Sequence, residues 1–349
     1  MKKVTVNDVA KKAGVSQTTV SRVLNNFPQM KESTRQKVLK AINELGYSPN
    51  EIARSMVNKK TRTIGLIVGD ISNPFYAEVA KVIMAEARKR GYDVIITDTD
   101  YDNDIFENNV RTLTSKQVDG ILIATIHHED TIVNQLNNTG FPIVYLNRIP
   151  EREDMHFVCL DDEKGSSIAV EHLIDLGHTN IAVTTYPSRF ATYYKRHLAF
   201  KNALIKYGNE ENKLNIYDGE FSYENIYNFV KQVLSSEKKP TAFVTTTDQQ
   251  AISVMDSVSK LGYSVPGDIS VVGFGDIGIA SHPYINLTTI SAQKEEMGRM
   301  ALNSLIEIIE SKSNRVSPVQ VMLEPKLIKR KTTSFLCNEK AKEGLGIFG

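Results

Sequence analysis

The chain has 349 residues, of which 24% are charged, and it contains two cysteines and no tryptophan. This length allows two or three domains, and no apolar run reaches the ~18 residues that a membrane-spanning helix needs. The N-terminus does not have the pattern of a signal peptide. We therefore expect a cytoplasmic protein in which the thiols of Cys159 and Cys337 are free.

Positive charge is concentrated at the N-terminus. Residues 1–60 hold 12 Lys and Arg but only 4 Asp and Glu, a net charge of +8, whereas the whole chain has a net charge of +1. The rest of the chain is therefore acidic overall and repels polyanions. A basic head on an acidic body is expected to bind phosphates in one defined place.

Three short helices are predicted in this basic head. The first covers about residues 6–13, with Thr5 as its N-cap, Asp8 near the capping-box position and Gly14 at its end. Ser16 begins the second helix, and Gly46 ends the third. Apolar side chains at helical spacing mark the inner faces of the second and third helices: Val20, Val23, Leu24, Val38, Ala41, Ile42 and Leu45.

The outer face of the second helix is polar and carries Gln17, Thr18, Ser21 and Arg22. These side chains can hydrogen-bond base edges or phosphates, and Arg can bind guanine through two bonds. Helix-turn-helix units place their second helix in the major groove of DNA. Together with the charge distribution, this pattern favours a DNA-reading head over a face that is merely solvated.

From residue 61 the chain alternates strand-like apolar runs with amphipathic helices. TIGLIVG predicts a strand, PFYAEVAKVIMAEARKRG a helix, and YDVIITD a second strand. Regular alternation with short loops predicts parallel sheets that are covered by helices on both faces. The pattern runs twice, before and after about residue 160, so we expect two similar α/β lobes. Ligands of such sheets bind outside the carboxyl ends of the strands, which places the site in the cleft between the lobes.

Five segments in a fixed order carry a family resemblance: AGVSQTTVSRVLN, LGYSPNEIARSM, TIGLIVGDISNPFYAE, DLGHTNIAV and NLTTI. Over about residues 3–333 the chain resembles the lac repressor / gal repressor (LacI/GalR) family of bacterial transcription regulators. The resemblance implies a core of the periplasmic-binding-protein type. It also implies a homodimeric repressor that binds two-fold symmetric operator DNA and an allosteric small-molecule effector.

The resemblance also divides the chain into segments. Residues 1–49 are the helix-turn-helix head, and residues 50–60 are a hinge helix. The two-lobe core is residues 61–335, with lobe 1 at about 61–160 and 291–322 and lobe 2 at about 161–290 and 323–335. The chain then crosses between the lobes near residues 160, 290 and 322. The helix after Asn73-Pro74 is expected in the dimer interface, and the tail, residues 336–349, lacks the leucine heptads of a coiled-coil tetramer.

Contacts with DNA are implied residue by residue. The implied phosphate contacts are Thr5, Ser16, Thr19, Ser21 and Asn25, and the implied base readers are Gln17, Thr18 and Arg22. Tyr47 and Asn50 match further family contacts, and Ala53 matches a small residue that lets the hinge enter the minor groove. Where the family wedges a Leu pair into that groove, this chain has Met56, an apolar but more flexible side chain.

The implied effector site lies in the cleft. Phe75, Tyr76 and Phe221 match family aromatics, Arg196 matches a residue that grips a ligand hydroxyl or carboxylate, and Thr192 matches a polar contact. The alternatives are lobe core for the aromatics and a surface ion pair for Arg196. The full expected set is Phe75, Tyr76, Thr125, Asn147, Thr192, Arg196, Phe221, Thr247, Asp248, Gly275 and Asp276.

Two departures from the family pattern bear on the effector. Sugar-binding members commonly have Asp where this chain has Asn147 and Gly275. Losing two carboxylates while keeping Arg196 shifts the pocket toward positive potential, so we hypothesise an effector with negative charge or acceptor atoms. Two alternatives stay open: Asp276 swings in to replace the lost acid, or no small ligand binds and a partner protein sets the state.

Other motifs favour no enzyme, cofactor or metal. The segment 273–278 matches G-x-G-x-x-G but lacks the helix and the acid of a dinucleotide fingerprint. Residues 127–130 (HHED) are adjacent residues that do not converge on one ion, and Ser188, His197 and Asp248 lack an elbow motif. His178 is interpreted as structural. A secreted solute-binding module is the closest architectural alternative, and the DNA-reading head opposes it.

Overall fold

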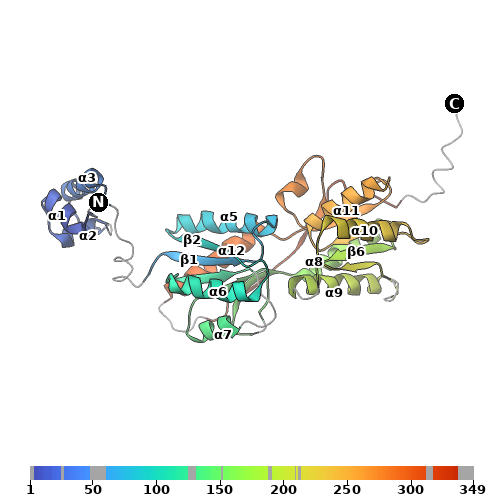
Figure 1. Ribbon diagram of the computed structural model, residues 1–349, viewed down its shortest axis with the longest axis horizontal. Helices are drawn as coiled ribbons and strands as arrows, with labels where there is room; N and C mark the ends of the chain where they lie inside the picture. Colours follow the sequence, from blue (N-terminus) through green and yellow to red (C-terminus); the bar gives the residue numbers. More distant parts are fainter. Residues whose placement is uncertain are drawn as a thin grey trace, which may run out of the picture. The chain divides into compact units, whose positions relative to one another are not determined.

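The computed structural model describes residues 4–24, 27–47, 60–124, 131–150, 152–187, 191–208, 210, 214–311 and 317–336. The chain divides into two compact units, Met1–Thr61 and Arg62–Gly349, which we call the head and the core. Figure 1 shows a helical head and a core in which helices surround two sheets. The hinge expected at residues 50–60 lies almost wholly outside the described residues.

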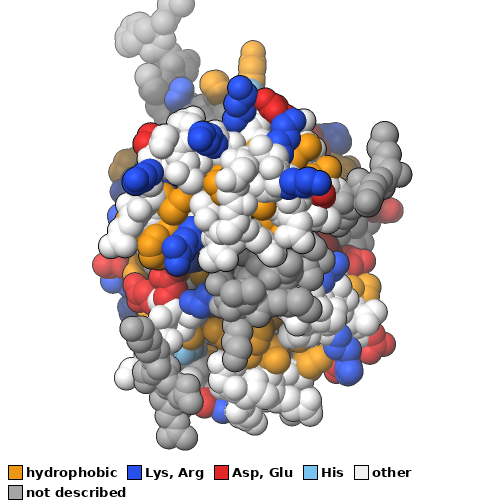
Figure 2. Space-filling model, turned by 90° about the vertical axis from the view of Figure 1, so that its left-hand side faces the viewer, with side chains coloured by type: hydrophobic (Ala, Val, Ile, Leu, Met, Phe, Trp, Pro, Cys, Tyr) orange, Lys and Arg blue, Asp and Glu red, His pale blue; other side chains and the backbone are white. Residues whose placement is uncertain are grey.

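Local sequence signals build the head. Its helices are α1 (Val6–Ala13), α2 (Gln17–Leu24) and α3 (Glu32–Leu45). A capping box of Thr5 and Asp8 begins α1, as predicted, and Gly14 ends it with a left-handed φ of 66°. Gly46, with φ 60°, ends α3 in the same way. The buried side chains that hold the three helices together are Val9, Ala10, Val20, Val23, Val38 and Ala41. In the space-filling view, Lys and Arg side chains are spread over the upper part of the face shown (Figure 2).

Lobe 1 is a six-stranded parallel sheet with the order β11-β5-β4-β3-β1-β2. Its strands are β1 (Thr63–Val68), β2 (Asp93–Asp98), β3 (Gly120–Ile123), β4 (Ile143–Leu146), β5 (His156–Leu160) and β11 (Gln320–Leu323). Its helices are α5 (Pro74–Lys89), α6 (Asn103–Ser115), α7 (Thr131–Asn138) and α12 (Lys294–Glu310). These helices cover both faces of the sheet, because successive residues of a strand point to opposite faces. Leu66 of β1 packs with α5 and α12, whereas Ile67 packs with α6 and α7.

Lobe 2 repeats this plan with the order β12-β10-β9-β8-β6-β7. Its strands are β6 (Ile181–Thr185), β7 (Ile216–Asp218), β8 (Ala242–Thr245), β9 (Ser270–Gly275), β10 (Thr288–Ser291) and β12 (Lys326–Ile328). Helices α8 (Asp162–Asp175) and α9 (Ala191–Lys206) cover one face, and α10 (Tyr223–Leu234) and α11 (Asp248–Lys260) cover the other. The two-lobe α/β fold is confirmed. One detail differs from the prediction of parallel sheets, because β12 runs antiparallel to β10.

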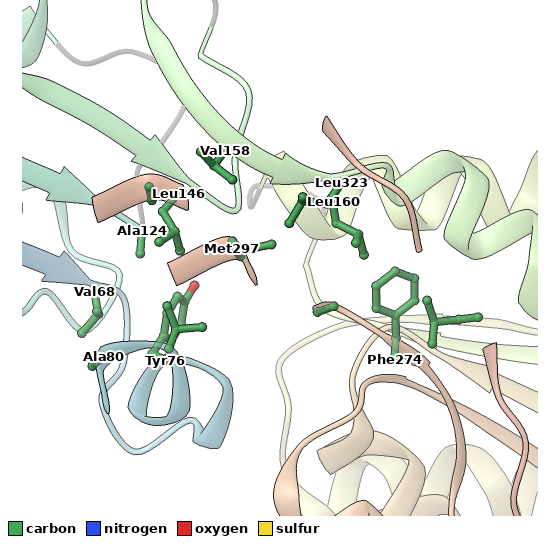
Figure 3. Close-up of a cluster of buried hydrophobic side chains, with 14 of the residues drawn as sticks. Val68, Tyr76, Ala80, Ala124, Leu146, Val158, Leu160, Phe274, Met297 and Leu323 are labelled. Atoms are coloured by element: carbon green, nitrogen blue, oxygen red, sulfur yellow. The ribbon is translucent and has the colours of Figure 1, made fainter. Parts of the chain in front are cut away.

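The chain passes between the lobes three times: from β5 to α8, from β10 to α12 and from β11 to β12. Apolar side chains on these passages join the cores of the two lobes into one cluster. Figure 3 shows Leu160 and Leu323 between Val158 and Leu146 on one side and Phe274 on the other. The cleft between the lobes therefore lies beside a packed junction. Small shifts of the side chains in this junction change how one lobe is oriented relative to the other.

Candidate functional sites

The outer face of α2 is the first candidate site. Gln17, Thr18, Ser21 and Arg22 are exposed on it. The opposite face is buried, with Val20 0% and Val23 3% exposed. The Arg22 guanidinium lies 5.5 Å from the centre of the Phe27 ring. The fold thus fixes the backbone of α2 from beneath and leaves its polar side chains at the surface.

Other expected DNA contacts also begin helices. The Thr5 hydroxyl donates to Asp8 Oδ2 at 2.7 Å, and Ser16 Oγ lies 2.9 Å from Thr19 Oγ1. Ser16 Oγ also accepts the Thr19 amide at 3.2 Å. Tyr47 is half-buried against the head core. Four expected contacts, Asn25, Asn50, Ala53 and Met56, lie outside the described residues.

The second candidate site is a pocket between the lobes of the core. It is lined by Asn73, Phe75, Tyr76, Asn147, Tyr193, Arg196, Thr247, Asp248, Gln249, Phe274, Gly275, Ile277 and Ala292. These residues follow the carboxyl ends of β1, β4, β8, β9 and β10 or lie on α9, as expected for such sheets. The expected residues that the fold brings together here are Phe75, Tyr76, Asn147, Arg196, Thr247, Asp248 and Gly275. The cavity has a volume of only about 30 Å³, which is room for water but not for a ring.

Arg196 does not present an unopposed positive charge to this pocket. Its side chain is buried, and its Nε donates to Asp162 Oδ1 at 2.7 Å. Its Nη1 donates to the Thr246 carbonyl at 2.8 Å, and its guanidinium lies 3.8 Å from the centre of the Phe274 ring. Burial raises the pKa of Asp162, and the adjacent Arg196 opposes that rise. The hypothesis of a shift toward positive potential did not consider Asp162, which offsets the charge of Arg196.

Asp248 organises the base of the pocket. It is 1% exposed, and its two oxygens accept hydrogen bonds from Thr289 Oγ1 at 2.5 Å and from the Ile277 amide at 2.8 Å. Burial raises its pKa to about 6, against these hydrogen bonds, which lower it. A Cβ on Gly273 would lie 2.3 Å from Asp248 Oδ1, so glycine leaves the space that this carboxylate fills.

Two expected residues do not line the pocket. Phe221 packs beside it, with its ring 5.7 Å from that of Tyr186. Asp276 turns away and pairs with Arg330, at 2.6 Å between Oδ1 and Nη2, so it does not replace a lost acid in this structure. Gly275 has φ 131°, a conformation that an Asp side chain rarely adopts. Thr125 and the side chain of Thr192 lie outside the described residues.

Sequence reasoning missed Tyr193, which lines the pocket, and Tyr186, which packs on it. Tyr186 stacks on Tyr193 with ring centres 4.4 Å apart and planes at 18°. No motif distinguishes these residues, and Tyr193 differs from the exposed Tyr194 only in the face of α9 on which it lies.

The remaining motifs have structural places. The segment 273–278 ends β9 and leads only into a short 3-10 helix, Gly278–Ser281. His178 lies 3.0 Å from Thr241 Oγ1 and 3.0 Å from the Ser334 carbonyl, so it ties the start of lobe 2 to the last described segment. Cys159 is a buried free thiol, whereas Cys337, Ser188 and residues 127–130 lie outside the described residues.

The described ranges contain neither a cluster of metal ligands nor a membrane-spanning helix. No group of three or more His, Cys, Asp or Glu is placed there to hold a metal ion. Across the same ranges, no helix combines the length and the apolar character needed to cross a membrane.

Comparison with known proteins gives the class. Residues 5–50 match the family "Bacterial regulatory proteins, lacI family", and residues 61–331 match "Periplasmic binding proteins and sugar binding domain of LacI family". Catabolite control protein A of Priestia megaterium is 34% identical, over 91% of this chain and 96% of that protein. The HTH-type transcriptional repressor PurR of Aliivibrio salmonicida is 33% identical, over 94% of this chain and 98% of that protein.

A solved structure matches both units. A crystal structure of the lac repressor dimer, bound to operator and the anti-inducer ONPF, superposes with a TM-score of 0.85 at 28% identity. The match covers 95% of this chain and 100% of that chain. The chain therefore belongs to the LacI family of bacterial regulatory proteins, with a helix-turn-helix head and a periplasmic-binding-protein-like core.

Proposed function

We propose that this protein is a cytoplasmic transcriptional repressor, and not an enzyme, that binds two-fold symmetric operator DNA as a homodimer. The observation that carries the proposal is the two-sided character of α2. Its outer face is polar and exposed, whereas Val20 and Val23 on its inner face are buried. Gln17, Thr18 and Arg22 then read base edges, and the basic charge of residues 1–60 binds phosphates. The related lac repressor structure, a dimer on its operator, supports the same arrangement.

The cleft between the lobes is proposed as the effector site. Phe75 and Tyr76 contribute aromatic faces, and Asn147, Arg196 and Thr247 contribute polar contacts. Residues 50–60 are proposed as the hinge that couples the lobes to DNA, with Met56 as the minor-groove wedge. An effector changes operator affinity only if it binds one arrangement of the lobes better than the other.

A second candidate function is a regulator whose state is set by a partner protein without a small ligand. The cavity of about 30 Å³ favours it, because pockets for small molecules usually enclose about 300–1,000 Å³. Opening of the lobes distinguishes the two candidates, since an effector site must become larger before it is filled.

Selection of bound DNA from a random pool tests the proposal. The purified full chain is expected to enrich a palindromic consensus, because a symmetric dimer binds two equivalent half-sites. Binding that falls with salt but enriches no sequence would contradict it, because phosphate contacts alone give that result.

A further inference from the structure

Lys294 of lobe 1 contacts the backbone of one turn in lobe 2. This turn, residues 275–278, leads from the end of β9 into a short 3-10 helix. Lys294 is the first residue of α12, and its side chain is 13% exposed. Its Nζ donates to the Gly275 carbonyl at 2.9 Å and to the Asp276 carbonyl. Both hydrogen bonds therefore pass from one lobe to the other.

Glu78 of lobe 1 binds the other end of the same turn. It lies on α5, and its Oε1 accepts the Gly278 amide at 2.7 Å. Its Oε2 lies 3.0 Å from Lys294 Nζ, and this ion pair stays within lobe 1 because α5 and α12 pack together. What crosses between the lobes is thus a set of hydrogen bonds from two opposite charges to backbone groups. We call Glu78 and Lys294 the lobe lock.

Lobe 2 holds the turn from its own side. Asp248 Oδ2 accepts the Ile277 amide at 2.8 Å, and Asp276 Oδ1 accepts from Arg330 Nη2 at 2.6 Å. Arg330 is itself placed by a bond from its Nη1 to the Leu287 carbonyl at 2.7 Å. The turn is therefore expected to move with lobe 2, so that breaking the lobe lock separates the lobes and does not unfold the turn.

The lobe lock is reached by solvent on its outer side. It borders an open hollow of about 820 Å³, which Glu78 and Lys294 line together with Asp276 and Gly278. The Glu78 side chain is 34% exposed. Hydrogen bonds to charged groups are stronger than neutral ones, but ions in solution screen charges that water reaches. The lock should therefore weaken as the salt concentration rises.

The turn that the lobe lock binds also lines the pocket between the lobes. Gly275 and Ile277 belong to the lining of that pocket, and so does Asp248, which holds the turn. A ligand in the pocket and the lobe lock would therefore act on the same four residues. The cavity of about 30 Å³ in this arrangement has no room for such a ligand.

We propose that Glu78 and Lys294 hold the two lobes in the arrangement seen here, which we call closed, and that the lobes open when their bonds to the turn break. A ligand larger than water binds only open lobes. The lock therefore lowers the affinity of the cleft for any ligand in proportion to the population of the closed state. This last consequence rests on the proposed effector role of the cleft, whereas the lock itself requires neither effector nor DNA.

The test is a distance measurement between spin labels on the two lobes of the full chain. The labels are attached at Glu107→Cys on α6 and Glu224→Cys on α10, both exposed positions, in a Cys337→Ser background in which Cys159 stays buried. Lys294→Met is expected to raise the ratio of open to closed lobes about tenfold to hundredfold, the effect of losing a hydrogen bond to a charged group. Lys294→Arg keeps the donors and should stay near wild type.

A second variant acts from lobe 2 without changing any charge. A Cβ on Gly278 would lie 3.2 Å from Glu78 Oε1, so Gly278→Ala should push the carboxylate away and open the lobes. Lys89→Met is the matched control. Lys89 is an exposed cation of α5 that pairs with Glu86 at 2.6 Å within lobe 1, so its loss should leave the distances unchanged.

An exchange variant separates the lobe lock from a simple ion pair. Glu78→Lys combined with Lys294→Glu keeps opposite charges on α5 and α12 but exchanges donor and acceptor toward the turn, so the lobes should stay open. Closed lobes in this variant would show that the ion pair within lobe 1 is sufficient and would overturn the proposal. Closed lobes in both Lys294→Met and Gly278→Ala would also overturn it. High salt should open the wild type and leave Lys294→Met unchanged, and the operator proposal is tested separately by the DNA selection.

Discussion

The carboxylate of Asp162 lies 2.7 Å from Nε of Arg196, which lines the pocket between the lobes, and the two side chains form a buried ion pair. Asp162 is the first residue of α8, directly after the chain leaves lobe 1, and Arg196 is on α9. Their side chains are 13% and 5% exposed, so water screens the pair weakly. Because Asp162 offsets the positive charge of Arg196 within the protein, Arg196 by itself does not favour an anionic effector.

Removing one partner of this pair should be costly. Asp162→Ala leaves Arg196 buried without its carboxylate, and such changes typically destabilise by about 3–5 kcal/mol. Urea unfolding of the full chain at pH 7 measures the effect. Asp154→Ala is the control, because its pair with Arg152 is largely exposed and should contribute less than about 1 kcal/mol. Equal unfolding midpoints for the two variants would show that the Asp162–Arg196 pair contributes little.

Asp248 should make stability depend on pH in a defined window. Burial raises the pKa of Asp248 from 3.8 to about 6 in the folded chain. Its contribution to the free energy of unfolding is therefore fully present below pH 3.8 and is lost as the pH rises through 6. The difference corresponds to about 3 kcal/mol. The free energy of unfolding of wild type minus that of Asp248→Asn, measured from pH 3.5 to 7.5, should fall across this window. A flat difference would contradict the assignment.

His178 should act in the opposite direction. Burial lowers the pKa of His178 from the ordinary histidine value of about 6.5. Its contribution to the free energy of unfolding is therefore present above this ordinary value and is lost as the pH falls through the lowered pKa. His178→Gln should therefore reduce the loss of stability between pH 7.5 and 5.5. It should also speed amide exchange at Leu336, which donates to the Leu176 carbonyl at 2.9 Å next to this tie. Unchanged exchange there would mean that His178 does not hold the last segment.

Local signals explain why much of the fold was predictable. Thr5, Asp8, Gly14 and Gly46 mark helix ends within a few residues of themselves, and period and length separate the long strands from helices. The short strands β7 and β12 have too few residues to show a period. Their places depend on neighbouring strands, which a single sequence does not reveal.

The site was predictable only where a family motif covered it. Phe75, Tyr76 and Arg196 were found in this way, and the pocket contains them. Asp162 was missed because its importance depends on a partner 34 positions away, Arg196. Asp276 was misjudged because its nearest cation, Arg330, follows it by 54 positions in sequence. Pairings over such separations are decided by the fold rather than by local pattern.

The central claim is that α2 reads bases, and Arg22 tests it most directly. The measurement is the affinity of wild type, Arg22→Ala and Lys231→Ala, at fixed salt, for the selected consensus DNA and for each of its single-base variants. Lys231 is an exposed cation of the core, so its variant controls for the loss of one charge. We predict that Arg22→Ala loses about 1–3 kcal/mol of discrimination at one position of each half-site, while Lys231→Ala keeps the wild-type pattern. A uniform loss over all sequences would contradict the account, because it would make Arg22 a phosphate contact and not a reader.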